Sequence, residues 1–353
     1  MWTYVDGRCD VRLPRGPSSG SSRFHALGFL ERGAVRVGAV LQLVLLGGVS
    51  CQRDEPATVP GEVRSAPADP SQMDAPGDSL TRILLELEPQ VAPVMEEIQR
   101  ARRDLRADSA SLRADSAFVE SFRELDATVR EVVKGFHSPA FQALLWPEGA
   151  GAQLLRREDP ERGGPAPEDW AMADSVMTFL AARGVWARRA EGSIDFAVNE
   201  AVLLEHWGPY LTPAVEEFLR QRVHEQFHPV AEDAGLMIPP SEVAARALWA
   251  ERFLEVHEGS IVHDIVASRL GWYLAVYIGG LPNTRPFHTP TGVVDPNWRT
   301  SFETIASEHG GSAVGRVVSE YLALLERSDF TRSTETDAFL ERMWEGVGWW
   351  PFP

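Results

Sequence analysis

Apolar residues recur along most of the chain at the three- and four-residue spacing of an amphipathic helix. The first such stretch begins near Ser79, a suitable N-cap, and continues through Ile98. Pro89 and Pro93 fall inside it and are expected to kink the helix or to split it in two. The chain is therefore predicted to be mainly helical from this segment onward.

A second periodic stretch follows, in which LRADSAS and LRADSAF repeat at a spacing of seven residues from Leu105. An intermolecular coiled coil usually needs three or more sustained heptads, so an intramolecular helical hairpin is the favoured interpretation. This hairpin defines a predicted N-terminal lobe over residues 79–146. Glycine, proline and charged residues over 147–167 then predict a loop.

Strict alternation of apolar residues appears within residues 185–198. The apolar residues of the second run share one face and are Ile194, Phe196 and Val198. A similar run, residues 185–189, precedes it across a turn. The pattern predicts a β-hairpin, which should pack on a neighbouring helix because a lone hairpin is only marginally stable. Helical spacing surrounds it and predicts a C-terminal helical domain over 168–353.

An internal repeat lies near the C-terminus. Residues 257–270 and 309–322 agree at six of fourteen positions at a spacing of 52 residues. Each copy is predicted to contain a helix end, a glycine turn that can adopt a positive φ, a serine N-cap and an amphipathic helix. The predicted turn glycines are Gly259 and Gly311, and the predicted serine caps are Ser260 and Ser312.

With the helices before them, the two copies form predicted helix pairs over residues 241–327. These pairs resemble the tetratricopeptide-like helix–turn–helix hairpins of bacterial envelope lipoproteins. The resemblance implies a stacked helical surface that binds partners. The expected fold class is mainly α, with antiparallel helical hairpins stacked in a repeat-like array and one small β-hairpin.

Composition and charge narrow the class of protein. The 353 residues are 44% hydrophobic and 24% charged, which is an ordinary globular composition. The 51 acidic residues outnumber the 34 basic ones, giving a net charge of −17. Nucleic acid is therefore not an expected partner, because phosphates require a basic face. Two cysteines cannot build a disulfide framework.

A ten-residue apolar run occupies residues 37–46 and follows Arg32 and Arg36. Ten residues are too few to span a bilayer, but they suit the core of a signal peptide. The run leads into small residues and Cys51, after which the chain at once becomes polar. This segment resembles the bacterial lipoprotein signal, with Gly48 where that signal most often has leucine.

The resemblance implies that residues 1–50 are a signal peptide and that Cys51, carrying palmitate or similar acyl chains, becomes the mature N-terminus. Loss of six arginines and three acidic residues takes the net charge from −17 to −20, so lipid must provide the membrane anchor. Five prolines predict a disordered tether over 51–78. The expected location is the bacterial cell envelope, lipid-anchored to a membrane and facing the periplasm or the exterior.

One motif carries candidate chemistry. Residues 224–228 read H-E-Q-F-H, which resembles the H-E-x-x-H motif of the zincin metallopeptidases. The resemblance implies a zinc ion held by His224 and His228, with Glu225 as general base toward a bound water. A third ligand would be needed, and Glu251 is the best candidate.

Two features of the sequence favour a structural interpretation of this motif. Pro229 directly follows it and disfavours helical geometry at His228. The helix that begins at Pro213 carries its apolar residues on the face opposite His224, so both histidines share a polar face with Glu217.

The favoured hypothesis is a lipid-anchored, non-enzymatic envelope protein whose helical body binds or scaffolds a protein partner. It assigns no catalytic, cofactor or metal site. The alternative hypothesis is a zinc-dependent metallopeptidase that uses residues 224–228.

Overall fold

The computed structural model describes residues 2–5, 8–11, 76–108, 113–149, 152–153, 164–190 and 193–347. These residues are mainly helical, as predicted, and they belong to one compact unit formed by Met1–Pro14 and Ala75–Pro353. The predicted lipidation site Cys51 lies outside the described residues, as do most of the predicted signal peptide and most of the predicted tether.

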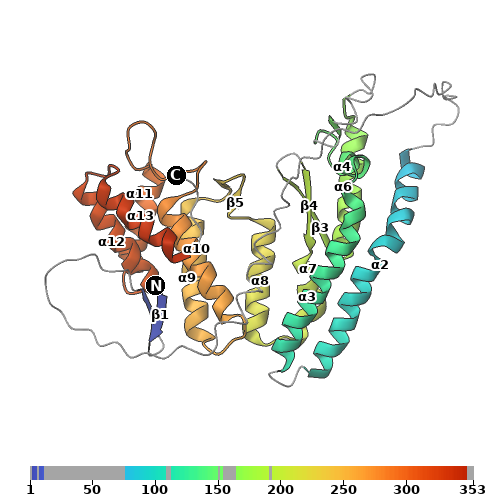
Figure 1. The fold of residues 1–353 in the computed structure, drawn as a ribbon, viewed down its shortest axis with the longest axis horizontal. Coiled ribbons are helices and arrows are strands. Elements are labelled where there is room, and N and C mark those ends of the chain that lie inside the picture. Colours follow the sequence, from blue (N-terminus) through green and yellow to red (C-terminus); the bar gives the residue numbers. More distant parts are fainter. Residues whose placement is uncertain are drawn as a thin grey trace, which may run out of the picture. The chain divides into compact units, whose positions relative to one another are not determined.

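The elements are shown in Figure 1. The described α-helices are α2 (Pro76–Asp108), α3 (Arg113–Val133), α4 (Pro139–Leu145), α6 (Pro167–Ala182), α7 (Glu200–Trp207), α8 (Pro213–Phe227), α9 (Pro240–Val256), α10 (His263–Gly279), α11 (Pro296–Glu308), α12 (Ala313–Arg327) and α13 (Thr334–Val347). The described strands form the antiparallel pairs β1 (Trp2–Val5) with β2 (Arg8–Val11), β3 (Val185–Ala190) with β4 (Ser193–Val198), and β5 (Ala231–Glu232) with β6 (Gly235–Leu236).

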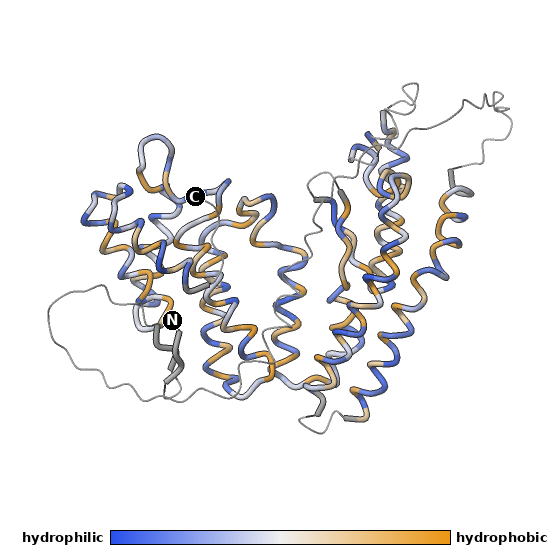
Figure 2. The backbone as a smooth tube through the Cα atoms, in the orientation of Figure 1, coloured by the Kyte–Doolittle hydropathy of each residue, from blue (hydrophilic) through white to orange (hydrophobic). Residues whose placement is uncertain are grey.

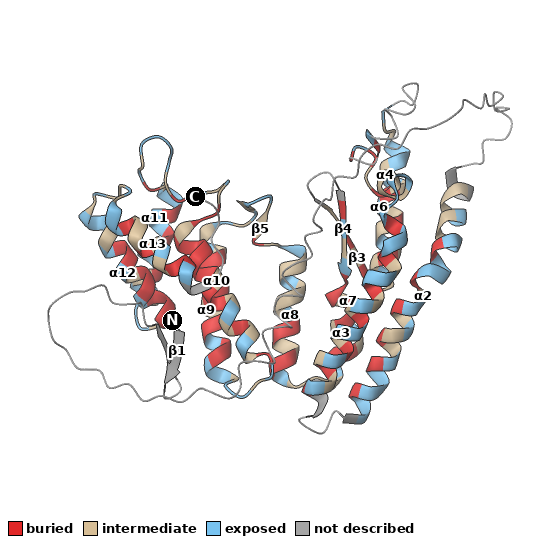
Figure 3. Cartoon of the chain, in the orientation of Figure 1, coloured by how far each residue is buried: buried red, intermediate tan, exposed pale blue. Residues whose placement is uncertain are grey.

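Helices α2 and α3 pack against each other within the chain, as the predicted hairpin requires. Helix α2 is continuous across Pro89 and Pro93, so the expected split does not occur. Both prolines lie on the exposed side of the helix, where water can hydrate the carbonyl groups left without an N–H donor. The buried residues Val91 and Val94 continue the apolar stripe on the other side. Figure 3 shows this division along both helices.

The predicted β-hairpin is present, with Val185 opposite Val198 at its open end. Its buried face includes Ile194 and packs on α3, α4 and α6. The side chain of Gln142 accepts a hydrogen bond from the Ile194 N–H at 2.8 Å, which satisfies part of the open edge of β4. The elements that follow the 147–167 segment therefore pack on those that precede it.

The second half of the described chain is an array of helix pairs, in agreement with the predicted fold class. Helices α9 and α10 pair, α11 and α12 pair, and α9 also contacts both helices of the second pair. A row of aromatic rings crosses the array, with ring centroids 5.1 to 5.6 Å apart. Its members are Tyr277, Phe302, Tyr321 and Phe339. Figure 2 shows apolar and polar positions alternating along these helices.

The two repeated turns differ in detail. The Ser312 hydroxyl accepts the Gly315 N–H at 2.9 Å and caps α12, as predicted. The Ser260 hydroxyl instead accepts the Val262 N–H at 3.3 Å, and α10 begins after Val262 without a side-chain cap, so the predicted Ser260 cap is wrong. The turn glycines also lack the expected positive φ, which in the described residues occurs at other glycines.

Replacing Ser312 with alanine should lower the free energy of unfolding by about 0.5–2 kcal/mol, because the Gly315 N–H loses its acceptor. Ser260→Ala should change it by less than about 0.5 kcal/mol, since no N–H of α10 depends on that hydroxyl. Urea unfolding followed by circular dichroism measures both values. Equal losses would contradict the difference between the two turns.

Gly315 is required at the beginning of α12 because the backbone of His309 passes close to it. A Cβ at this position would lie 1.8 Å from the His309 carbonyl oxygen, whereas a Cβ at Gly311 would meet nothing within 4 Å. Gly315→Ala should therefore cost about 1–3 kcal/mol through overpacking. Gly311→Ala is the matched control, and its thermal and urea unfolding should stay close to those of the unchanged chain.

Candidate functional site

Helix α8 carries the motif that the sequence singled out. Its residues Val215, Phe218 and Leu219 are buried, and α8 packs with this face against α7. The helix ends at Phe227, and His228 follows with a non-helical backbone, as the proline after it predicts. Polar residues occupy other positions of the helix and its C-cap, and we call them the polar stripe: Glu217, Gln221, His224, Glu225 and His228.

Glu217 lies at the beginning of this polar stripe and binds three side chains of the next helix and its end. Its carboxylate accepts hydrogen bonds from Trp249 Nε1 and Arg252 Nη2, both at 3.0 Å, and lies 3.1 Å from His257 Nε2. Partial burial opposes ionisation, but these bonds and the Arg252 charge lower the pKa of Glu217 below its usual value. His257, which follows the last residue of α9, thus has the Glu217 carboxylate as its partner.

The Glu225 side chain is largely covered, with 12% of its surface exposed, and it points from α8 to side chains of α10. Its carboxylate is paired with Arg269 and accepts a hydrogen bond from the Tyr273 hydroxyl, and Gln221 Nε2 donates to it at 3.1 Å. Burial opposes ionisation of Glu225, but the Arg269 charge and the Tyr273 hydrogen bond lower its pKa. Burial, together with the nearby Glu225 charge, raises the pKa of the Tyr273 hydroxyl. The carboxylate proposed as a general base is thus the anionic partner of an ion pair.

A second buried pair lies beside the first. Arg222 Nε donates to Glu200 Oε1 at 3.1 Å, and the Glu200 carboxylate is only 4% exposed. The other oxygen, Oε2, has no hydrogen-bond partner within the described residues. The backbone N–H of Glu200 donates to Gln226, whose amide in turn donates to the Val198 carbonyl at 2.8 Å. These bonds fix α8 to the start of α7.

The two histidines of the motif lie side by side, with ring centroids 5.1 Å apart. His224 Nε2 is 3.2 Å from Glu242 Oε1 on α9, and Arg246 donates both to Glu242 and, at 2.8 Å, to the His228 carbonyl. The pKa of Glu242 is lowered, because the bonds from His224 and Arg246 outweigh its partial burial. The motif therefore forms a set of contacts between α8 and α9.

Glu251 does not join these histidines. It is buried, and its two oxygens accept the backbone N–H groups of Ala313 and Val314, the latter at 3.0 Å. With the Ser312 cap, the first N–H groups of α12 are then satisfied, and the negative charge sits at the positive end of the helix dipole. The described residues contain no group of three or more His, Cys, Asp or Glu side chains placed to hold a metal ion.

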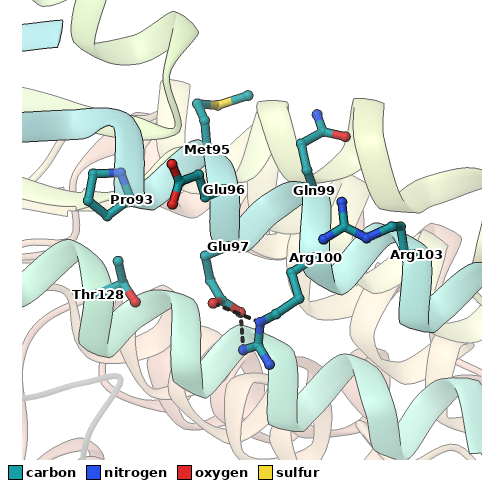
Figure 4. A pocket seen from close by; sticks show the side chains of 8 residues that line it. All are labelled: Pro93, Met95, Glu96, Glu97, Gln99, Arg100, Arg103 and Thr128. Atoms are coloured by element: carbon teal, nitrogen blue, oxygen red, sulfur yellow. Dashed lines mark hydrogen bonds and ion pairs between the residues drawn. The ribbon is translucent and has the colours of Figure 1, made fainter. Parts of the chain in front are cut away.

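A pocket of about 760 Å³ lies along α2 beside α3 and is shown in Figure 4. Arg100 in this pocket donates to Glu97 at 2.6 Å and is also paired with Glu124. Its acidic and basic side chains balance one another, so the pocket shows no clear preference for a charged ligand. The lining residues are Pro93, Met95, Glu96, Glu97, Gln99, Arg100, Arg103 and Thr128.

Sequence reasoning missed the partners of the polar stripe on α8. Arg269 and Tyr273, four residues apart on α10, are such partners, and so is Arg246 on α9. The sequence did contain a signal for Arg246. Like Glu251, it interrupts an otherwise apolar face of α9, and a buried charge requires a partner.

Comparison with models of protein families, with curated proteins and with solved structures finds no match to this chain. None of the helices in the described part of the chain could span a bilayer, given its length and polarity.

Replacing Glu225 with glutamine should lower the free energy of unfolding by about 3–5 kcal/mol, because Arg269 would remain buried without its anionic partner. Glu216→Gln is the matched control, since Glu216 pairs with Arg220 on the solvent-facing side of the same helix. That surface change should cost less than about 1 kcal/mol. Urea unfolding of both variants tests the assignment, and similar losses for the two would contradict it.

Proposed function

We propose that the protein is a lipid-anchored, non-enzymatic component of the bacterial cell envelope, with a helical body that binds or scaffolds a protein partner. The observation that carries the proposal is the array of paired helices α9–α12, because stacked helix pairs present extended surfaces suited to binding other proteins. The lipoprotein-like segment that ends at Cys51 supports the anchored location.

The candidate catalytic groups are already bound to other side chains and backbone groups, which also favours a scaffold over a zinc peptidase. A peptidase would need Glu225 available to activate water and Glu251 available to bind metal. Glu225 is instead bound to Arg269 and Tyr273, and Glu251 caps α12.

The proposed attachment is by lipid, with the acidic body facing the periplasm or the exterior. Without residues 1–50 the net charge of the chain changes from −17 to −20, which gives no electrostatic attraction to an anionic membrane or to nucleic acid. Two or more acyl chains on the mature N-terminus would give stable anchoring.

Metabolic labelling with a palmitate analogue in a bacterial host tests the anchor. The chain has two cysteines, and Cys9 provides the matched control. Cys51→Ala should abolish the label and move the protein from the membrane fraction to the aqueous fraction. Cys9→Ala should keep both the label and the membrane fraction, because residue 9 would be removed with the signal peptide.

Equal labelling of the unchanged chain and of Cys51→Ala would refute the anchor. Loss of label in Cys9→Ala alone would place the modification at the other cysteine and would refute the proposed signal peptide as well.

A further inference from the structure

The two faces of α8 make different kinds of contact. Val215, Phe218 and Leu219 pack against α7, so α8 belongs by its apolar packing to the elements that precede it. We call α2 through α8 with the β3–β4 hairpin the first half, and α9 through α13 the second half. Helix α8, the last helix of the first half, is drawn in yellow in Figure 1.

Toward the second half, α8 presents its polar stripe. The backbone of α8 does not run in close contact with that of α9 or α10, and side chains from those helices bridge to it. The bridges are the hydrogen bonds and ion pairs of Glu217, His224, Glu225 and the His228 carbonyl. This junction is therefore fastened by charge and hydrogen bonding.

Burial changes along the stripe. At the end of α8, the contacts use Tyr273 and Arg246, which are 0% and 3% exposed. At its beginning, the Arg252 side chain is 66% exposed and that of Glu217 is 33% exposed. Glu217 lies ten residues before Phe227, the last residue of α8, which corresponds to about 15 Å along the axis. Near the end of α8 the His224 and Glu242 side chains are also accessible, at 47% and 38% exposed, so the Glu217 contacts differ from them in their distance from the end of the helix.

The connection after α8 belongs with the second half. The Asn283 N–H donates to the Ala234 carbonyl at 2.9 Å, and the Leu236 N–H donates to the Thr284 hydroxyl at 3.0 Å. These bonds attach the β5–β6 hairpin to the end of α10. The helix itself stops at Phe227, so the chain passes from the first half to the second over residues 227–230, where Arg246 donates to the His228 carbonyl.

From these contacts we propose that the junction is a hinge. In this proposal the first half swings about residues 227–230. The closed arrangement is held by the Glu217 cluster, which we define as Glu217, Trp249, Arg252 and His257. Opening exposes carboxylate, guanidinium and imidazole groups, which water solvates, so the free-energy cost is small compared with that of separating an apolar interface.

A distance measurement between the halves tests the hinge. Spin labels are placed on the exposed positions by Glu205→Cys on α7 and Glu255→Cys on α9, in the full-length chain carrying Cys9→Ser and Cys51→Ser. Raising the salt concentration from 0.05 to 0.5 M should increase the fraction of molecules in which the two spin labels are farther apart, because screening weakens exposed charge pairs.

Glu217→Gln should raise that fraction roughly tenfold at low salt, the loss expected for hydrogen bonds to a charged group. Glu216→Gln, one residue away and paired within α8, should leave the distances unchanged. Circular dichroism should show the same helical content in both variants. Identical distances in the two variants, no response to salt, or loss of helix in Glu217→Gln would each overturn the proposal.

Discussion

The buried carboxylate of Glu225 is the interaction on which the arrangement around α8 depends. A charge removed from water must be paired and hydrogen-bonded, or its desolvation destabilises the fold. Arg269 and Tyr273 meet this need from consecutive turns of α10, and Gln221 adds a bond from α8 itself. The rotation of α8 about its axis is then set by this ion pair together with the apolar packing of the helix.

Much of the architecture could be predicted from the sequence because it is encoded locally. Apolar spacing located the helices, and period-two alternation located the β3–β4 hairpin. Proline after His228 indicated where α8 ends. The partners of Glu225 and Glu251 could not be predicted, because they lie 44 to 63 residues away along the chain. Local patterns carry no information about contacts at that separation.

The H-E-x-x-H spacing shows why a short motif has more than one physical meaning. Histidines one turn apart share a helix face, whether that face binds a metal ion or another helix. In α8 the same spacing directs His224 toward Glu242 and brings the His228 carbonyl to Arg246. The distinguishing feature is the partner of the glutamate between them, which here is an arginine.

The contact of Glu251 with the beginning of α12 has a consequence for folding. In a solenoid whose units touch only their neighbours through apolar faces, each unit can fray separately. Here a carboxylate on the first helix of one pair satisfies the N–H groups of the second helix of the next pair, across 62 and 63 residues of chain. The first turn of α12 thus depends on a side chain of α9, so we expect the two helix pairs to unfold as a single cooperative block.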